Sequence, residues 1–273
     1  VSAHYNLGEV VHSEFLRRTF NQVYRLDFES GRRAVARLCA DRPRGQPNLR
    51  FEAQALDHLA GQGCTVSRCV PAANGEPFIW APLPEGERAL MMFEFLDGEF
   101  TGEADEDIHA FGLGLAGLHA AGESYRGVAS AYTLDLDYLL LKPLEGFLRA
   151  PTMTAALRLQ FEALGQRLYE RIRALGELSR VLCHGDAHGQ NNFVVQGETG
   201  GRQAVFFDFD EAGPGYLAYE LAVYPWSMYP RSPEGKPSEQ VLQRWGHFIS
   251  AYREVRPVPE ADLRAIALFM AVR

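Results

Sequence analysis

Residues 181–195 read V-L-C-H-G-D-A-H-G-Q-N-N-F-V-V, and this stretch decides the fold that the sequence predicts. A short apolar strand leads into a polar loop that contains Asp186, and Asn191 follows five residues later in the same loop. The apolar residues 193–195 then begin a second strand. The pattern predicts a polar loop held between two strand ends.

A second acidic strand end follows soon afterwards. Residues 204–210 read A-V-F-F-D-F-D, a buried-strand pattern that ends in carboxylates. The strand ends can therefore present Asp186, Asn191 and Asp208 at one point. Transfer of a phosphoryl group requires such a set, because one carboxylate orients an acceptor hydroxyl while an amide oxygen and another carboxylate hold Mg²⁺.

Two other interpretations of these residues are open. Asp and Asn often stand at strand ends because their side chains bond the nearby backbone, so each residue alone is typical of a turn. The spacing His184-x-Asp186-x-His188 also has the character of a metal-ligand set for hydrolysis. Phosphoryl transfer is favoured because three polar residues stand in register and no matching cluster occurs among the other histidines: His4, His12, His58, His109, His119 and His247.

The pattern H-G-D-x-x-x-x-N, followed by a hydrophobic strand that ends D-[FW]-[DE], resembles the signature of the aminoglycoside phosphotransferase/choline kinase-like family. This family has a protein-kinase-like fold, in which the two motifs correspond to the catalytic loop and the D-F-G aspartate. The resemblance implies ATP and Mg²⁺ as cofactors. It also implies that Asp186 is the catalytic aspartate and that Asn191 and Asp208 are metal ligands.

The first 96 residues are expected to form a nucleotide-binding lobe with an antiparallel sheet and one helix. Alternating apolar and polar residues indicate strands, and apolar residues at helical spacing indicate the helix. The expected elements are strands at 20–28, 33–39, 78–81 and 89–95, a turn at 29–32, a loop at 41–48 and a helix at 49–60.

Residues 97–273 are expected to form a larger, mainly helical lobe that carries the catalytic residues and the acceptor site. Helices are expected at 108–119, 153–178, 218–224, 241–255 and 261–272. The predicted fold is thus α/β of the α+β kind, bilobal and protein-kinase-like. The resemblance implies that the segment 93–98 is the hinge between the lobes, where the backbone at Glu94 and Leu96 binds adenine.

The phosphate side departs from protein kinases, because the first 96 residues contain no lysine. Arg37 stands in V-A-R-L, where kinases have V-A-x-K, and an arginine can bind phosphate through two donors. The resemblance implies that Glu52, on the expected helix, holds this arginine. No G-x-G-x-x-G covers the phosphates, and the tip of the first hairpin offers backbone N–H groups with the side chains of Thr19 and Asn21 instead.

Other features of the second lobe extend the resemblance. The family's usual D-L-A reads E-L-A here, which implies that Glu220 braces the catalytic loop; Asp210 is expected at or near the metal. Either an acceptor pocket, including one for a quaternary amine, or core packing would explain the aromatic residues Tyr216, Tyr219, Tyr224, Trp226 and Tyr229.

The sequence leaves the acceptor open. Relatives phosphorylate aminoglycosides, choline or ethanolamine, homoserine, methylthioribose or protein Ser/Thr side chains, and the E-F-L-D-G and D-F-D segments favour the homoserine-kinase-like and stress-response-kinase-like branch. We expect a small-molecule hydroxyl acceptor. The alternatives are a protein Ser/Thr kinase and a nucleotide-binding pseudokinase; the missing lysine favours the latter, while the complete set of Asp186, Asn191 and Asp208 disfavours it.

Composition limits the possible partners of this 273-residue chain. The net charge is −8, and residues 97–273 hold the whole excess with 24 acidic and 16 basic side chains, which argues against nucleic acid. No signal peptide is visible, and the apolar stretch at 110–121 is too short and too rich in glycine to span a membrane. The four cysteines form no C-x-x-C pair, so free thiols in the cytoplasm are expected, and the oligomeric state is left open.

Overall fold

The computed structural model describes residues 1–40, 48–197, 200–229 and 236–273, so the loop expected at 41–48 lies outside the described residues except for Asn48. The elements in chain order are β1 (Val10–Arg18), β2 (Gln22–Phe28), β3 (Arg33–Leu38), α1 (Leu49–Gly61), β4 (Cys69–Val70), β5 (Phe78–Leu83), β6 (Gly86–Glu94), β7 (Glu99–Phe100), α2 (Asp105–Gly122), the π-helix η1 (Asp137–Leu141), α3 (Lys142–Leu148), α4 (Ala155–Arg173), β8 (Arg180–Cys183), β9 (Asn192–Gln196), β10 (Arg202–Phe206), β11 (Gly213–Tyr216), α5 (Leu217–Met228), α6 (Glu239–Val255) and α7 (Glu260–Val272).

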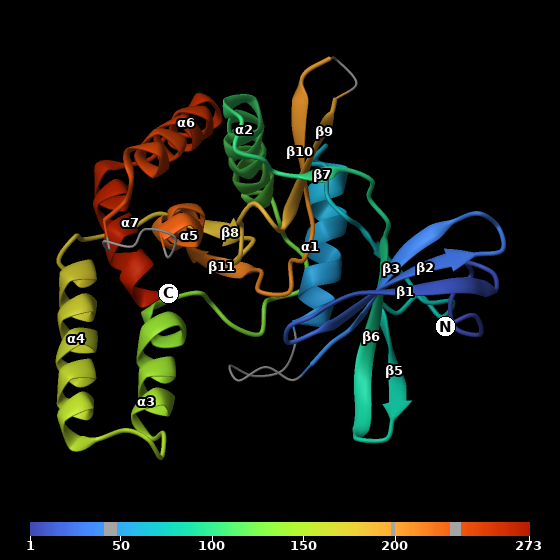
Figure 1. Cartoon of the computed structure of the whole chain (residues 1–273), viewed down its shortest axis with the longest axis horizontal. Coiled ribbons are helices and arrows are strands. Elements are labelled where there is room, and N and C mark those ends of the chain that lie inside the picture. The colour runs from blue at the N-terminus through green and yellow to red at the C-terminus, as the bar shows by residue number, and fades with distance from the viewer. Residues whose placement is uncertain (41–47, 198–199, 230–235) are drawn as a thin grey trace.

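An antiparallel sheet lies on one side of the molecule and the helices α2–α7 lie on the other, with α1 between them (Figure 1). The strand order is β1-β2-β3-β6-β4, and β5 pairs with β6. Side chains alternate across β3: Ala34 and Ala36 pack into a small core with Leu26 and Phe28 of β2. The opposite face of β3 therefore turns Arg37 toward α1.

The helices share one core with α1. Helix α2 buries Ile108, Phe111 and Leu115 and packs against α6. The two helices approach closely at Gly112, where an added Cβ would lie 2.5 Å from the carbonyl oxygen of Phe248. None of the helices in the described part of the chain has both the length and the apolar composition needed to cross a membrane.

Two small antiparallel sheets position the loop at 184–191. One sheet joins β8 to β11 and the other has the order β10-β9-β7, so the loop runs from the end of β8 to the start of β9. A parallel bridge pairs Val66 with Phe206, and the Phe206 N–H donates to the carbonyl of Thr65 at 3.0 Å. The end of β10 is thereby fixed to the segment that connects α1 with β4.

The predicted α+β fold with an antiparallel sheet and a helical part is confirmed. Two predicted elements end earlier than expected. The strand expected at 204–210 stops at Phe206, because Asp208 has a φ of 66° that no extended strand allows. The helix expected at 153–178 spans Ala155–Arg173, with Thr154 as its N-cap. Cys39, Cys64, Cys69 and Cys183 are free thiols, as predicted.

Candidate active site

The loop after β8 starts with a backbone turn that only glycine adopts easily. Gly185 has a φ of 87°, and a Cβ on it would lie 2.3 Å from the carbonyl oxygen of Glu211. Glu220 of α5 holds the same turn, since its carboxyl oxygens accept from the N–H groups of His184 at 3.2 Å and Gly185 at 2.9 Å. The turn aims Asp186 away from the core, with 27% of its side chain exposed.

Asp186 and Asn191 meet directly, as their spacing predicts. The carboxamide nitrogen of Asn191 donates to both the backbone carbonyl and Oδ2 of Asp186 at 3.0 Å. His188 Nε2 lies 3.3 Å from the same Oδ2, and Arg273 contacts Oδ1. Burial works to raise the pKa of Asp186, but the hydrogen bond from His188 and the charge of Arg273 outweigh it and hold the pKa below its usual range. The carboxylate is therefore ionised at neutral pH.

Asp208 lies beside Asn191 because the Phe207 N–H donates to the Asn191 carbonyl at 3.1 Å. Its φ of 66° is a left-handed conformation that asparagine and aspartate tolerate better than most residues, and such strain is common at functional sites. Two arginines contact its carboxylate: Arg37 Nη1 lies 3.3 Å from Oδ1, and Arg17 contacts Oδ2.

The donors at this point fit a magnesium ion. The carboxylate of Asp208 and the carboxamide oxygen of Asn191 are hard oxygen ligands of the kind that Mg²⁺ prefers. The nitrogen of the Asn191 carboxamide is turned toward Asp186, so its oxygen is the end available to a metal.

Arg37 and Glu52 form a buried ion pair, with 3% and 2% of their side chains exposed. The two guanidinium nitrogens donate to the two carboxylate oxygens at 2.8 and 2.5 Å, a two-point geometry that favours arginine. Burial acts against the charged form of Arg37, but Glu52 outweighs it and keeps the guanidinium pKa above its ordinary value. The expected support of Arg37 by Glu52 is thus present in the structure.

A cavity of about 400 Å³ lies next to this cluster, and both Arg37 and Asp208 line it. The predicted hinge residues Glu94 and Leu96 line it as well, and Ser67 donates to the Glu94 carbonyl at 2.8 Å. Most of the wall is apolar, which suits a flat aromatic base; the apolar residues are Leu16, Val23, Val35, Phe93, Phe95, Phe100, Phe193 and Phe207.

The tip of the β1–β2 hairpin places its two predicted residues differently. Thr19 is exposed at the tip, and its N–H donates to the Asn21 carbonyl at 3.1 Å. Asn21 is buried, and its carboxamide bonds Asp210 at 2.5 Å and the N–H of Ala40 at 3.2 Å. The side chain of Asn21 therefore connects the hairpin to Asp210, and neither residue lines the cavity.

His184 has a structural position. Its Nε2 lies 3.0 Å from the Phe207 carbonyl and its Nδ1 lies 3.4 Å from the Asp186 N–H, so both ring nitrogens are engaged. Burial lowers the pKa of His184 to about 4, which keeps the ring neutral. These contacts argue against the hydrolytic interpretation of the His-x-Asp-x-His spacing. Among the described residues, no group of three His, Cys, Asp or Glu side chains is placed to hold a metal ion.

Comparison with known proteins decides the family. Residues 14–258 match the family described as "Phosphotransferase enzyme family". The chain belongs to this family. The prediction of a phosphotransferase is therefore confirmed.

The phosphotransferase is also similar to a relative of unknown activity and to solved structures of other proteins. An uncharacterized protein of Deinococcus radiodurans is 38% identical over 261 residues, which are 94% of this chain and 73% of the relative. The structure is similar to that of the amicoumacin kinase hAmiN in complex with AMP-PNP, Ca²⁺ and Ami, with a TM-score of 0.78, 21% identity and coverage of 99% and 80%. It is also similar to a microcompartment-associated aminopropanol kinase, with a TM-score of 0.73, 20% identity and coverage of 99% and 84%. These likenesses show the kinase-like fold.

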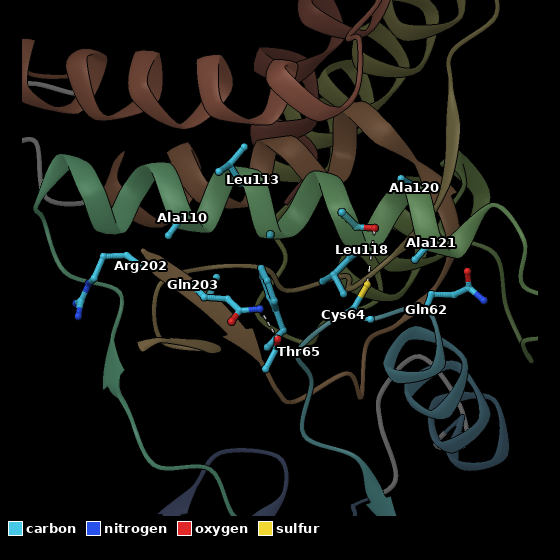
Figure 2. Close-up of a pocket in the computed structure, with 15 residues that line it drawn as sticks. Gln62, Cys64, Thr65, Ala110, Leu113, Leu118, Ala120, Ala121, Arg202 and Gln203 are labelled. Carbon is cyan, nitrogen blue, oxygen red and sulfur yellow. Dashed lines mark hydrogen bonds between the residues drawn. The ribbon is translucent and has the colours of Figure 1, made fainter. Parts of the chain in front are cut away.

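A second cavity of the phosphotransferase, of about 580 Å³, lies between α2, β10 and the end of α1 (Figure 2). Its lining includes Arg202 and no carboxylate, and Gln203 donates to Thr65 Oγ1 at 2.6 Å across it. None of the predicted site residues lines this cavity. The predicted site residues Arg37, Glu94, Leu96 and Asp208 line the cavity of about 400 Å³ instead.

Two arginines at the site of the phosphotransferase had no role assigned from the sequence. Arg17 stands in the hairpin expected at the phosphates, but nothing in its surroundings points to Asp208, 191 residues away. Arg273 follows α7, and no sequence motif connects it with Asp186. Both contacts depend on how distant elements pack.

The buried carboxyl of Glu220 predicts a pH dependence of stability. Burial raises its pKa to about 7, although the N–H of Gly185 acts in the opposite direction. The folded pKa lies above the unfolded value of about 4.3, so the folded state binds more protons between these values and stability falls as pH rises through this window. The free energy of unfolding, measured by denaturant titration from pH 4 to 8, should fall more steeply for the wild type than for Glu220→Gln. Parallel curves would contradict the assignment.

Proposed function

We propose that the enzyme transfers the γ-phosphoryl group of ATP to a hydroxyl group of a small molecule in an Mg²⁺-dependent reaction. One observation carries the proposal: Asn191 bonds Asp186 through its side chain and Phe207, next to Asp208, through its backbone, and Asp208 lines the same cavity as Arg37. The similar structures are an amicoumacin kinase in complex with AMP-PNP, Ca²⁺ and Ami and an aminopropanol kinase, which supports the same class of reaction here.

Asp186 orients the acceptor hydroxyl and takes its proton. A bond forms between the acceptor oxygen and the γ-phosphorus, while the bond to the β–γ bridging oxygen breaks and ADP leaves with that electron pair. Mg²⁺ bound to Asn191 and Asp208 would offset the charge on the phosphate oxygens. Most of the rate enhancement comes from positioning and from preorganised charge.

The nucleotide occupies the cavity with its base between the apolar side chains and the hinge backbone at Glu94 and Leu96. Arg37, fixed by Glu52, contacts the phosphates through its charge. Asn21 supports the hairpin through Asp210. Arg17 joins Arg37 as a second phosphate-facing cation.

Ligand-induced stabilisation tests the nucleotide and metal assignments. ATP with Mg²⁺ should raise the melting temperature, with about 2.7 kcal/mol of stabilisation at a ligand concentration 100 times Kd, and chelation of the metal should remove most of the effect. The variant Asp208→Asn should lose the metal dependence. The matched control Asp57→Asn alters an exposed ion pair with Arg68 and should behave as wild type.

Turnover is then measured as ADP release with amino alcohols, homoserine, aminoglycosides and a protein substrate. Acceptor-dependent release supports a kinase and indicates its acceptor class. Metal-dependent ATP binding with no release under any acceptor would favour the pseudokinase interpretation. Absence of ATP binding would contradict the nucleotide site itself.

A further inference from the structure

Arg273 lies at the centre of a charged cluster beside the catalytic loop. Its guanidinium contacts Oδ1 of Asp186, and Nη1 donates to the carbonyl of Gly185 at 3.0 Å and to the hydroxyl of Tyr219 at 2.9 Å. The guanidinium carbon lies 4.8 Å from the centre of the Trp226 ring. Only 14% of the Arg273 side chain is exposed, so the protein holds this cation firmly in place.

These contacts occupy both carboxylate oxygens of Asp186. Oδ2 accepts from Asn191 and lies near His188, while Oδ1 faces Arg273. Each carboxylate oxygen can accept more than one hydrogen bond, so an acceptor hydroxyl reaches Asp186 by replacing one of these partners or by sharing its oxygen. Arg273 is the partner on the side away from Asn191, so the acceptor has to displace it or share its oxygen.

We propose, on the basis of the proposed function, that Arg273 selects an acceptor that carries a carboxylate in addition to its hydroxyl group. The acceptor carboxylate takes the place of Asp186 as the partner of the guanidinium, whose two parallel donors match a carboxylate. Oδ1 of Asp186 then receives the hydroxyl proton as the oxygen attacks the γ-phosphorus and ADP leaves.

Other acceptor classes fit this cluster less well. A cationic acceptor would lie beside the like charge of the guanidinium. A quaternary amine binds on aromatic rings, but the guanidinium already covers the ring of Trp226 and lies 5.7 Å from the centre of the Tyr219 ring. A neutral alcohol would separate Arg273 from Asp186 and offer no charge in exchange, which is costly for a largely buried pair. Residues 97–273 carry more acidic than basic side chains, but the side chain that contacts Oδ1 of Asp186 is the cation of Arg273.

Matched acceptor series test the proposal. Calorimetry measures binding to the protein of three hydroxycarboxylates (glycolate, β-hydroxypropionate and γ-hydroxybutyrate) and of three amino alcohols (ethanolamine, aminopropanol and aminobutanol). KM and kcat for each compound are measured from ADP release. The wild type should prefer one hydroxycarboxylate over the amino alcohol of similar length. Arg273→Gln should raise Kd and KM for that hydroxycarboxylate about 30-fold or more, the scale of a lost charge-assisted pair, and should narrow or reverse the preference.

Two further variants separate selectivity from folding. Arg273→Lys keeps the charge without the two-donor geometry and should give an intermediate loss. Arg264 lies on α7, the helix that precedes Arg273, and forms an exposed pair with Glu260, so Arg264→Met should match the wild type.

The outcomes distinguish this inference from the proposed function. A wild type that binds none of the hydroxycarboxylates, or an Arg273→Gln variant that weakens both series equally, overturns the role of Arg273. A wild type that phosphorylates amino alcohols in preference supports the proposed function and overturns this inference. Hydroxycarboxylate binding that depends on Arg273 without ADP release supports the site and contradicts the proposed reaction.

Discussion

Replacement of Asp186 by alanine is expected to leave Mg²⁺-dependent ATP binding intact and to lower turnover by ~10³-fold or more. The carboxylate is ionised, and in the proposed reaction it receives the acceptor hydroxyl, so its loss would remove both the orientation of the acceptor and the proton acceptor. Binding is measured by thermal shift, and turnover by ADP release with the best acceptor found. Near-normal turnover would exclude Asp186 from the reaction.

The control for this prediction has to distinguish the loss of the reacting carboxylate from the loss of the charge that pairs with Arg273. Asp186→Ala also leaves Arg273 without its carboxylate partner, so Asp186→Asn, which keeps the shape of the side chain, is measured in parallel. Both variants should lose turnover to a similar extent. Asp137→Asn, in an exposed pair with Lys142, provides the matched surface substitution and should retain activity.

Replacement of Glu52 by alanine is expected to destabilise the fold by about 3–5 kcal/mol, because it leaves the buried guanidinium of Arg37 with only the longer contact to Asp208. The melting temperature should fall by on the order of 10 °C for a chain of this size. Denaturant titration gives the free energy directly. A loss within 1 kcal/mol of zero, judged against the ~±0.5 kcal/mol of surface substitutions, would contradict a buried ion pair.

A double variant separates stability from nucleotide binding. Arg37→Met with Glu52→Leu replaces the pair by apolar side chains of similar size and should recover much of the lost stability. The double variant should nevertheless bind ATP poorly, since it lacks the guanidinium that Arg37 would place at the phosphates. A double variant with wild-type affinity for ATP would show that Arg37 has only a structural role.

The sequence predicted those parts of the site that depend on short segments. Asp186 and Asn191 belong to one loop, and the pairing of Arg37 with Glu52 follows from the order of a strand and the next helix in a kinase-like lobe. Asp208 follows a strand whose apolar pattern is easily recognised. The structure brings these residues together, while the roles given to them stay predictions.

The sequence patterns did not predict contacts between distant segments. Arg17 reaches Asp208 and Arg273 reaches Asp186 only because β1 and α7 pack where they do. The same holds for Asn21, which was expected at the phosphates and bonds Asp210 instead. The early end of the strand before Asp208 was also missed, because an apolar side chain follows the strand at Phe207 and another stands at Phe209, while the backbone turns at Asp208.

If metal and nucleotide bind as proposed, the contact between Arg17 and Asp208 makes their binding an exchange of counter-ions. A divalent cation that takes the Asp208 carboxylate has to take it from Arg17, and the released guanidinium then needs an anion. The nucleotide phosphates are that anion, so we expect metal and nucleotide to enter cooperatively, each binding weakly without the other. Because Arg17 belongs to β1, such an exchange would also break the contact that joins the β1–β2 hairpin to Asp208.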